Sequence, residues 1–251
     1  MIAPTMLDEL CRPGAVRVEF QPIVQLRDGV PHLYGFEALS RGPRGTTMEV
    51  PNVMFEYARR KGRETDIDRL CVATALAAAA ALPPGPIISI NVHGTTLCNT
   101  PRFAADLIEG AQANGIAPGR LMIEILEHRV SWVMETLHAT LQELREAGVR
   151  IAVDDLGVGA SNFRMFVDCR PDHIKIDRYI VHGCSGDRYR LASLRSIVAL
   201  ANACDAVPIA EGVEDAEDLA AVRSLGIECV QGWHFGRSQP ASEIDVSEFL
   251  H

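Results

Sequence analysis

The chain has 251 residues, of which 47% are hydrophobic and 23% are charged, and its net charge is −9. This composition is typical of a globular protein with a sizeable core and excludes a disordered chain. The negative charge disfavours non-specific binding to a nucleic acid polymer or to an anionic membrane, because both require a basic surface. It is compatible with a small anionic ligand, since bound cations can invert the local charge.

The cysteines and the apolar segments indicate the cellular compartment of the protein. None of the seven cysteines belongs to a CxxC pair, which argues against a zinc ribbon or thioredoxin-like chemistry. They are best explained as small apolar residues in a reducing compartment. No apolar secretory segment opens the chain, and Pro83–Pro86 interrupts its most apolar stretch, so we expect no membrane segment. These features predict a cytoplasmic protein.

Short apolar and β-branched runs predict eight strands. In chain order they cover Arg17–Gln21, Leu33–Leu39, Ile87–Val92, Leu121–Leu126, Arg150–Asp154, His173–Ile176, Val207–Glu211 and Cys229–Gln231. Between most of these strands, apolar residues recur at helical spacing or strong helix formers accumulate. The helices predicted in this way cover Asp66–Leu82, Ser131–Ala147, Leu191–Ala203 and Asp215–Leu225.

The alternation of strands and helices predicts an α/β fold of the TIM (β/α)8 barrel type. The start of the chain departs from this pattern, because only Pro22–His32 separates the first two strands and leaves no room for a crossover helix. This segment contains Asp28-Gly29, a hairpin signal. We therefore expect a modified TIM barrel with an antiparallel first strand, formed by a single domain over residues 1–251.

Acidic residues lie at the ends of several predicted strands, namely Glu37, Glu124, Asp154, Asp155 and Glu211. In TIM-type barrels the chemistry lies at the carboxyl ends of the strands, which would bring these acids together with Asn91 and Lys175. Oxygen-rich groups of this kind hold hard cations such as Mg²⁺ or Mn²⁺. Each carboxylate alone is more simply explained as a solvated strand end or a helix cap. Their convergence predicts a metal-dependent hydrolase acting on a phosphate ester.

Seven short motifs occur in a fixed order, namely FEALSR, the NV of INVHGTTL, EILE, DDLGVG, HIKID, EGVE and QGWHF. Together they resemble the EAL-domain cyclic di-GMP phosphodiesterases, and the resemblance extends from Phe20 to Pro240. The fold of that family, a modified TIM barrel with one antiparallel strand, agrees with the predicted hairpin. The resemblance implies hydrolysis of cyclic di-GMP to linear pGpG by a metal-activated water, so that the domain would be of EAL type.

The resemblance also implies a role for each motif residue. The ligands of two Mg²⁺ or Mn²⁺ ions would be Glu37, Asn91, Glu124, Asp154, Asp155 and Glu211. A pair of such ions can activate a water and neutralise phosphate oxygens. Lys175, which its carboxylate neighbours should keep charged, would orient the water or stabilise the transition state. Gln231 would assist at the site together with Glu211, and Glu127 would steady the loop after Asp155.

Two residues are expected to bind substrate. Arg41 would grip a phosphate through its planar guanidinium, and Gln21 would touch a guanine edge. Without the motif, Arg41 would be interpreted as an exposed loop arginine. Glu214 fits equally well a role in the site or a stabilising role at the start of the next helix. His93 is an extra ligand or a pH-sensitive neighbour in one interpretation; in the preferred one it points away or bonds a backbone carbonyl.

The loop after the aspartate pair departs from the family pattern. DDLGVGASNF stands in place of DDFGTGYSSL, so Val158 and Ala160 replace a threonine and a tyrosine. A different activity or a different contact between protomers is therefore an open alternative, since family members often form homodimers. The runner-up function is a catalytically silent EAL domain that binds cyclic di-GMP and signals through a protein partner. An enolase-type lyase is a third alternative, which Arg41, Lys175 and Gln231 disfavour.

Overall fold

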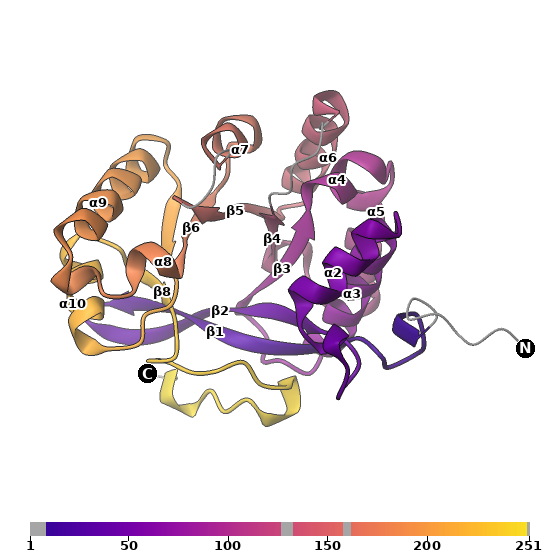
Figure 1. The fold of residues 1–251 in the computed structure, drawn as a ribbon, viewed down its shortest axis with the longest axis horizontal. Coiled ribbons are helices and arrows are strands. Elements are labelled where there is room, and N and C mark those ends of the chain that lie inside the picture. Colours follow the sequence, from indigo (N-terminus) through magenta and orange to yellow (C-terminus); the bar gives the residue numbers. More distant parts are fainter. Residues whose placement is uncertain (1–8, 127–132, 158–161, 250–251) are drawn as a thin grey trace, which may run out of the picture.

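The structure is a computed structural model that describes residues 9–126, 133–157 and 162–249. Within these ranges, eight strands close into a barrel in the order β1 to β8, with helices around its outside (Figure 1). The strands are β1 Arg17–Arg27, β2 Val30–Arg41, β3 Ile87–His93, β4 Leu121–Leu126, β5 Arg150–Leu156, β6 His173–Ile176, β7 Val207–Ala210 and β8 Cys229–Gln231. The predicted modified TIM barrel is confirmed.

The helices fill the connections that follow β2 to β7. They are α2 Pro51–Arg60, α3 Glu64–Ala79, α4 Gly94–Asn99, α5 Phe103–Ala113, α6 Met134–Glu146, α7 Asn162–Cys169, α8 Arg178–Val181, α9 Arg188–Ala203 and α10 Ala216–Ser224. Four of them (α3, α6, α9 and α10) correspond to the helices predicted from the sequence, apart from residues 131–132, which lie outside the described residues. No helix in the described part of the chain is long and apolar enough to cross a membrane.

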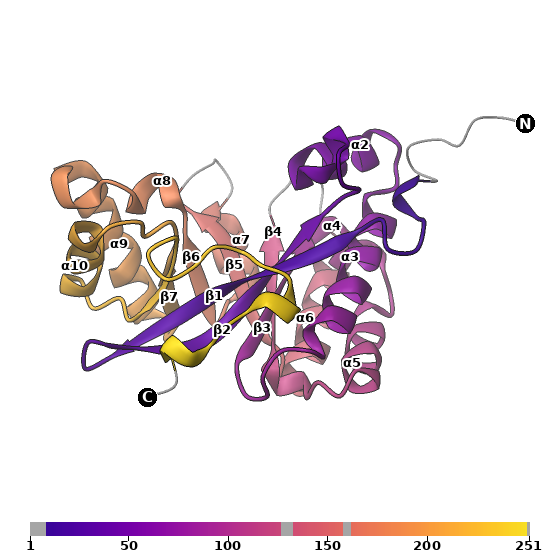
Figure 2. The ribbon, with the colours of Figure 1, turned by 90° about the horizontal axis from the view of Figure 1, so that it is seen from below.

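The first strand runs antiparallel to both of its neighbours, β2 and β8. The turn between β1 and β2 consists of Asp28 and Gly29, whose φ angles of 51° and 85° match the left-handed conformation that a two-residue hairpin requires. The prediction ended the first strand at Gln21, and this boundary is wrong. β1 continues through Pro22, because β8 pairs with β1 from Ile23 onward and Phe20 pairs with Gln239 of the C-terminal segment. Figure 2 shows this segment crossing the hairpin.

The other strands are parallel from β2 to β8, so their carboxyl ends meet at one rim. Side chains alternate along each strand between the barrel interior and the surrounding helices. Six buried residues form an apolar layer inside the barrel, namely Ile23, Ile87, Met122, Ala152, Ile209 and Cys229. Two positions further toward the rim, the inward side chains are polar. The apolar layer therefore lies directly beneath a polar layer at the rim.

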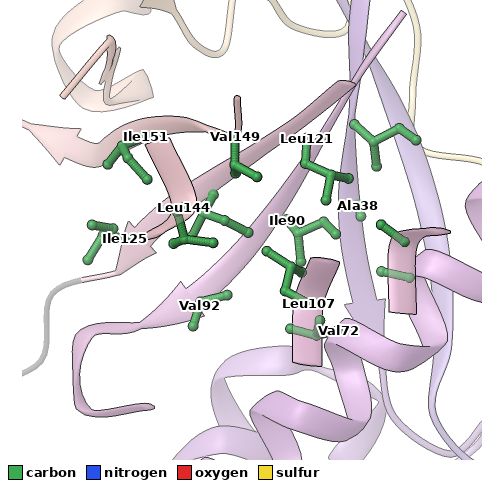
Figure 3. Packing of buried hydrophobic residues seen from close by; sticks show 14 of the residues in the cluster. Ala38, Val72, Ile90, Val92, Leu107, Leu121, Ile125, Leu144, Val149 and Ile151 are labelled. Carbon is green, nitrogen blue, oxygen red and sulfur yellow. The ribbon is translucent and has the colours of Figure 1, made fainter. Parts of the chain in front are cut away.

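The outward side chains of the strands form the main core with the helices. On β3, Ile90 and Val92 face outward and pack with Val72 of α3 and Leu107 of α5 (Figure 3). A second cluster fills the space between β5–β8 and helices α8–α10. Burying each large aliphatic side chain stabilises the fold by about 1.5–3 kcal/mol. This packing fixes the strands whose ends carry the polar layer.

A tyrosine–histidine pair lies at the opposite end of the barrel interior. The Tyr34 hydroxyl is 2.5 Å from Nε2 of His173, which is 3% exposed. Burial lowers the pKa of His173 from 6.5 to about 4 and raises the pKa of Tyr34. His173 is therefore neutral in the folded protein at ordinary pH.

We expect His173 to make the protein sensitive to acid. Between pH 6.5 and pH 4 the unfolded chain binds a proton at this residue that the folded chain excludes, so stability falls as the pH falls. The expected loss is about 2 kcal/mol at pH 5 relative to pH 7.5. The free energy of unfolding of His173→Gln, measured in urea, should lack this part of the pH dependence. The exposed control variant His138→Gln should retain it. Identical pH profiles for wild type and His173→Gln would contradict the assignment.

Candidate active site

A cavity of about 280 Å³ opens where the carboxyl ends of the strands meet. Side chains of five strands (β1, β2, β5, β6 and β8), the start of α8 and the loops after β7 and β8 form its wall. The lining residues are Gln21, Glu37, Leu39, Asp154, Lys175, Arg178, Glu211, Gly212, Glu214, Gln231, Gly232 and Trp233. The rim position is the one expected from the sequence. Gln21 reaches it from the first half of β1, because this strand is antiparallel and Gln21 pairs with Glu37.

Lys175 of β6 lies at the centre of the polar layer and is 1% exposed. Its Nζ is 2.7 Å from Glu124 Oε2, 3.0 Å from Glu37 Oε2 and 2.5 Å from Glu211 Oε1. Burial alone would lower the pKa of the ammonium, but the carboxylates raise it well above its ordinary value. Lys175 is therefore a buried cation that joins the ends of four strands.

Glu37 is held by neutral donors as well as by the ammonium. Asn91 Nδ2 donates to its Oε1 at 2.8 Å, and Gln231 Nε2 donates to its Oε2 at 2.7 Å. Burial raises the pKa of Glu37, but Lys175 and these two amides outweigh burial and lower it. The carboxylate of Glu37 is therefore ionised.

Glu124 has no exposed surface and accepts bonds on both oxygens. The Ser89 hydroxyl donates to Oε1 and Lys175 donates to Oε2. Burial and the neighbouring Glu37 raise the pKa of Glu124 to about 8. Ser89 was not among the residues predicted for the site, although the alternation of IISIN along β3 places it on the same side as Asn91.

Three carboxylates form a second group, which we call the acid triad: Asp154, Asp155 and Glu211, of which Glu211 also contacts Lys175. Each offers an oxygen within 4.8 Å of the others. Burial is the main cause that raises the pKa of all three, to about 7 for Asp155 and well above the ordinary value for Glu211. One ammonium cannot neutralise five carboxylates, and the triad retains the excess. Its hard oxygen donors fit a divalent cation such as Mg²⁺ or Mn²⁺.

The backbone of Asp155 adopts a left-handed conformation with φ 54°, which is uncommon for a residue other than glycine. This conformation turns the Asp155 N–H toward Asp154, whose Oδ1 accepts it at 2.9 Å. The Asp155 carboxyl also forms a hydrogen bond with Asp177, a residue of HIKID that the sequence analysis did not consider. The irregular backbone thus places two consecutive acids on one side of the strand end.

A family model of the EAL domain matches residues 5–238 of this chain, and the barrel and rim described above lie almost entirely within that range. The chain belongs to the EAL domain family.

Solved EAL structures share this fold. BlrP1 of Klebsiella pneumoniae, in a complex with calcium and cyclic di-GMP, is 29% identical with a TM-score of 0.79, over 94% of this chain and 58% of that chain. A standalone EAL protein of Vibrio cholerae in its cyclic di-GMP-bound form is 25% identical with a TM-score of 0.75, over 90% of this chain and 93% of that one.

A curated relative of Escherichia coli is named "Probable cyclic di-GMP phosphodiesterase PdeI". It is 29% identical to this EAL domain over 93% of the chain. The chain spans only 28 to 31% of the length of this and three other curated relatives of similar identity.

The six expected metal ligands of the EAL domain are brought together, but in two groups. Asp154, Asp155 and Glu211 form the acid triad. Glu37 and Glu124 bind the Lys175 ammonium, and Asn91 donates its amide to Glu37. The group of Glu37, Glu124 and Asn91 is thus organised by the chain's own ammonium.

The two expected substrate residues bond to the C-terminal segment. Arg41 contacts Glu19 Oε2 and Ser238 Oγ, both at 3.1 Å, and does not line the cavity. Gln21 donates to the Gly236 carbonyl at 3.1 Å and accepts a bond of 3.2 Å from Gln231 Nε2. Neither residue is a free surface side chain.

Glu214 and His93, for which two interpretations were open, lie in different places: Glu214 lines the cavity and His93 does not. Glu214 lines the cavity and forms an ion pair of 2.8 Å with Arg178, while Asp215 caps α10. His93 is 2% exposed, and its Nδ1 lies 2.9 Å from Asp68 Oδ1 outside the cavity lining. Its orientation away from the site agrees with the preferred interpretation, and α3 supplies the carboxylate that Nδ1 contacts. Glu127, Val158 and Ala160 lie outside the described residues.

We expect Lys175→Met to destabilise the EAL domain by about 3–5 kcal/mol, because it leaves buried carboxylates without their cation. The loss should be larger at pH 8 than at pH 5.5, where the remaining carboxylates can take up protons instead. The chain contains one other lysine, Lys61, which is exposed, so Lys61→Met is the matched control. Chemical unfolding of both variants tests the expectation, and equal stabilities would refute it.

Proposed function

We propose that this EAL domain is a phosphodiesterase that hydrolyses cyclic di-GMP to linear pGpG with Mg²⁺ or Mn²⁺. The observation that carries the proposal is the acid triad, of which Asp154 and Glu211 line the cavity and Glu211 lies 2.5 Å from the buried Lys175. BlrP1 was solved with cyclic di-GMP and with either calcium or manganese, and PdeI is named as a cyclic di-GMP phosphodiesterase. These likenesses support the same substrate here.

The proposed metal ligands are Asp154, Asp155 and Glu211 with Glu37, Asn91 and Glu124. Divalent cations held there would supply the acidity that activates a water and would neutralise phosphate oxygens. The donor set fits this role, because carboxylate and amide oxygens are hard ligands. Two ions are proposed, the number that the family resemblance implies.

The chain's own residues position the reacting groups. Lys175 cannot act as a base, because its carboxylate neighbours keep it protonated. Its ammonium is placed to stabilise negative charge that develops on the phosphate. Gln231 fixes Glu37 through the 2.7 Å bond and thereby assists at the site. Glu127, outside the described residues, is proposed to steady the loop after Asp155.

Substrate binding involves the rim. In this proposal the Arg41 guanidinium contacts a phosphate, and Glu19 and Ser238 hold it in orientation beforehand. Gln21 presents its amide beside Gln231 and is proposed to meet a guanine edge. A homodimer and a cytoplasmic location remain expectations drawn from the family resemblance and from the composition.

Incubation with cyclic di-GMP and Mn²⁺ tests the activity, with pGpG followed by chromatography. Wild type should form pGpG, and Glu37→Ala should reduce the rate by about 100-fold or more, because it removes a ligand and a partner of Lys175. Glu217→Ala on the exposed side of α10 is the matched control and should retain the rate. Tight binding of cyclic di-GMP by wild type without turnover would instead identify a receptor, the alternative function.

Cation binding should depend on pH in a defined direction. The pKa of Asp155 is raised to about 7 and that of Glu124 to about 8, so part of this group is protonated at pH 6. Divalent cations bind the deprotonated oxygens, so affinity for Mn²⁺ should rise from pH 6 to pH 8 and binding should release protons. Titration calorimetry in buffers of different ionisation enthalpy measures this release. A binding constant independent of pH would refute the assigned ligands.

A further inference from the structure

Helix α3 carries two buried acids, Glu64 and Asp68, one turn apart on the side that faces the carboxyl end of β3. Asp68 has no exposed surface, and Glu64 is 8% exposed. A buried carboxylate weakens a fold unless donors surround it, and an apolar residue would pack at such a position with less desolvation. Neither acid lines the cavity, so the site described above does not account for them.

Asp68 accepts hydrogen bonds from the segment that joins β3 to α4. The backbone N–H of His93 donates to Oδ2 at 3.1 Å, and the Thr96 hydroxyl donates to the same oxygen. The imidazole Nδ1 of His93 lies 2.9 Å from Oδ1. Because both carboxylate oxygens have partners, Asp68 holds the last residue of β3 and the first turn of α4 against α3.

Glu64 makes the same kind of contact one turn earlier in α3. It accepts a bond of 2.8 Å from the Thr95 hydroxyl and forms an ion pair of 2.7 Å with Arg59 of α2. Phe55, also from α2, has its ring centroid 4.6 Å from that of the His93 imidazole. Helices α2 and α3 thus enclose the imidazole, which is 2% exposed.

Asn91 lies two residues before His93 on β3 and is the one neutral residue among the proposed metal ligands. Its Nδ2 donates to Glu37 Oε1 at 2.8 Å. An amide carries no net charge, so attraction to a cation holds it in place less strongly than it holds a carboxylate. The position of Asn91 therefore depends on the backbone that carries it. The packing of Val92 in the core and the contacts of His93 with Asp68 fix that backbone.

We propose that Asp68 and His93 are positioning residues for Asn91, an inference that rests on the proposed function. Neither side chain lines the cavity. They act by holding the end of β3, so that the Asn91 nitrogen stays bonded to Glu37 and its oxygen is presented as a ligand for a divalent cation. Contacts of this kind, one step removed from the metal, change metal affinity about 10- to 100-fold when they are lost.

Binding of Mn²⁺ to the substrate-free protein tests the inference, measured by calorimetry at a temperature where every variant is folded. Leucine and asparagine have nearly the same shape, but only asparagine carries a nitrogen donor close to the position of Nδ1. His93→Leu should raise the dissociation constant of at least one Mn²⁺ about tenfold, whereas His93→Asn should stay within about threefold of wild type. His138→Leu on the exposed side of α6 is the matched control and should bind Mn²⁺ as wild type does.

A purely structural role of His93 predicts a different result. It would lower the melting temperature of His93→Leu without changing the Mn²⁺ affinity of the folded protein, and that outcome would overturn this inference alone. If His93→Leu does not fold, Thr96→Val replaces it, because it removes only the hydroxyl donor to Asp68. Thr96→Val should raise the same dissociation constant at least about threefold, and an unchanged constant would again overturn the inference.

The hydrolysis assay gives a second readout. His93→Leu should require about tenfold more Mn²⁺ for its half-maximal rate, while KM for cyclic di-GMP at saturating Mn²⁺ should change less than about threefold. A rate that stays low at every Mn²⁺ concentration would contradict a role in positioning a metal ligand. If wild type binds Mn²⁺ without turnover, the proposed activity fails and the calorimetric comparison still decides the inference. If wild type binds no Mn²⁺, the proposed function and this inference both fail.

Discussion

The site depends on the contact between the Lys175 ammonium and the carboxylates of Glu37, Glu124 and Glu211. Desolvation of an isolated ammonium and of three isolated carboxylates would each cost several kcal/mol, and their contact offsets much of that cost. Because Glu37 and Glu124 lie on β2 and β4 and Glu211 directly follows β7, their contact with Lys175 of β6 also fixes the relative positions of four strand ends. Removal of any member of this cluster therefore leaves buried charge without its partner.

The barrel makes this cluster possible through the alternation of side chains along its strands. On β4, for example, Met122 belongs to the apolar layer and Glu124 lies two residues beyond it at the rim. The apolar layer prevents water from reaching the polar groups from below, so hydrogen bonds such as that of Ser89 to Glu124 form in a poorly solvated environment. The antiparallel β1 completes the wall by bringing Gln21 next to Gln231. The packing thus determines the electrostatics of the rim.

Most of the fold could be predicted from the sequence, since each strand has a distinct apolar run and Asp28-Gly29 specifies the hairpin. The rim position of the acids followed from the same pattern. The partners within the site could not be predicted in this way, because they join residues far apart in the chain. The hydrogen bond of Ser89 to Glu124 is such a tertiary contact, which no local motif encodes. The left-handed Asp155, likewise, is stabilised by its surroundings and not by its intrinsic preference.

The cationic side chains near the site are already paired with other acids, so they leave negative charge on the acid triad. Lys175 is already surrounded by acids, Arg178 is paired with Glu214, and Arg41 is paired with Glu19. Lys175 lowers the pKa values of Asp154 and Asp155, but burial outweighs it and raises both; Glu37 also raises the pKa of Asp154, and Asp154 raises that of Asp155. An anionic ligand entering the cavity would meet this negative charge first. In the proposed function, neutralisation by divalent cations would therefore accompany the binding of a phosphodiester, because the arginines at the mouth lie outside the acid triad.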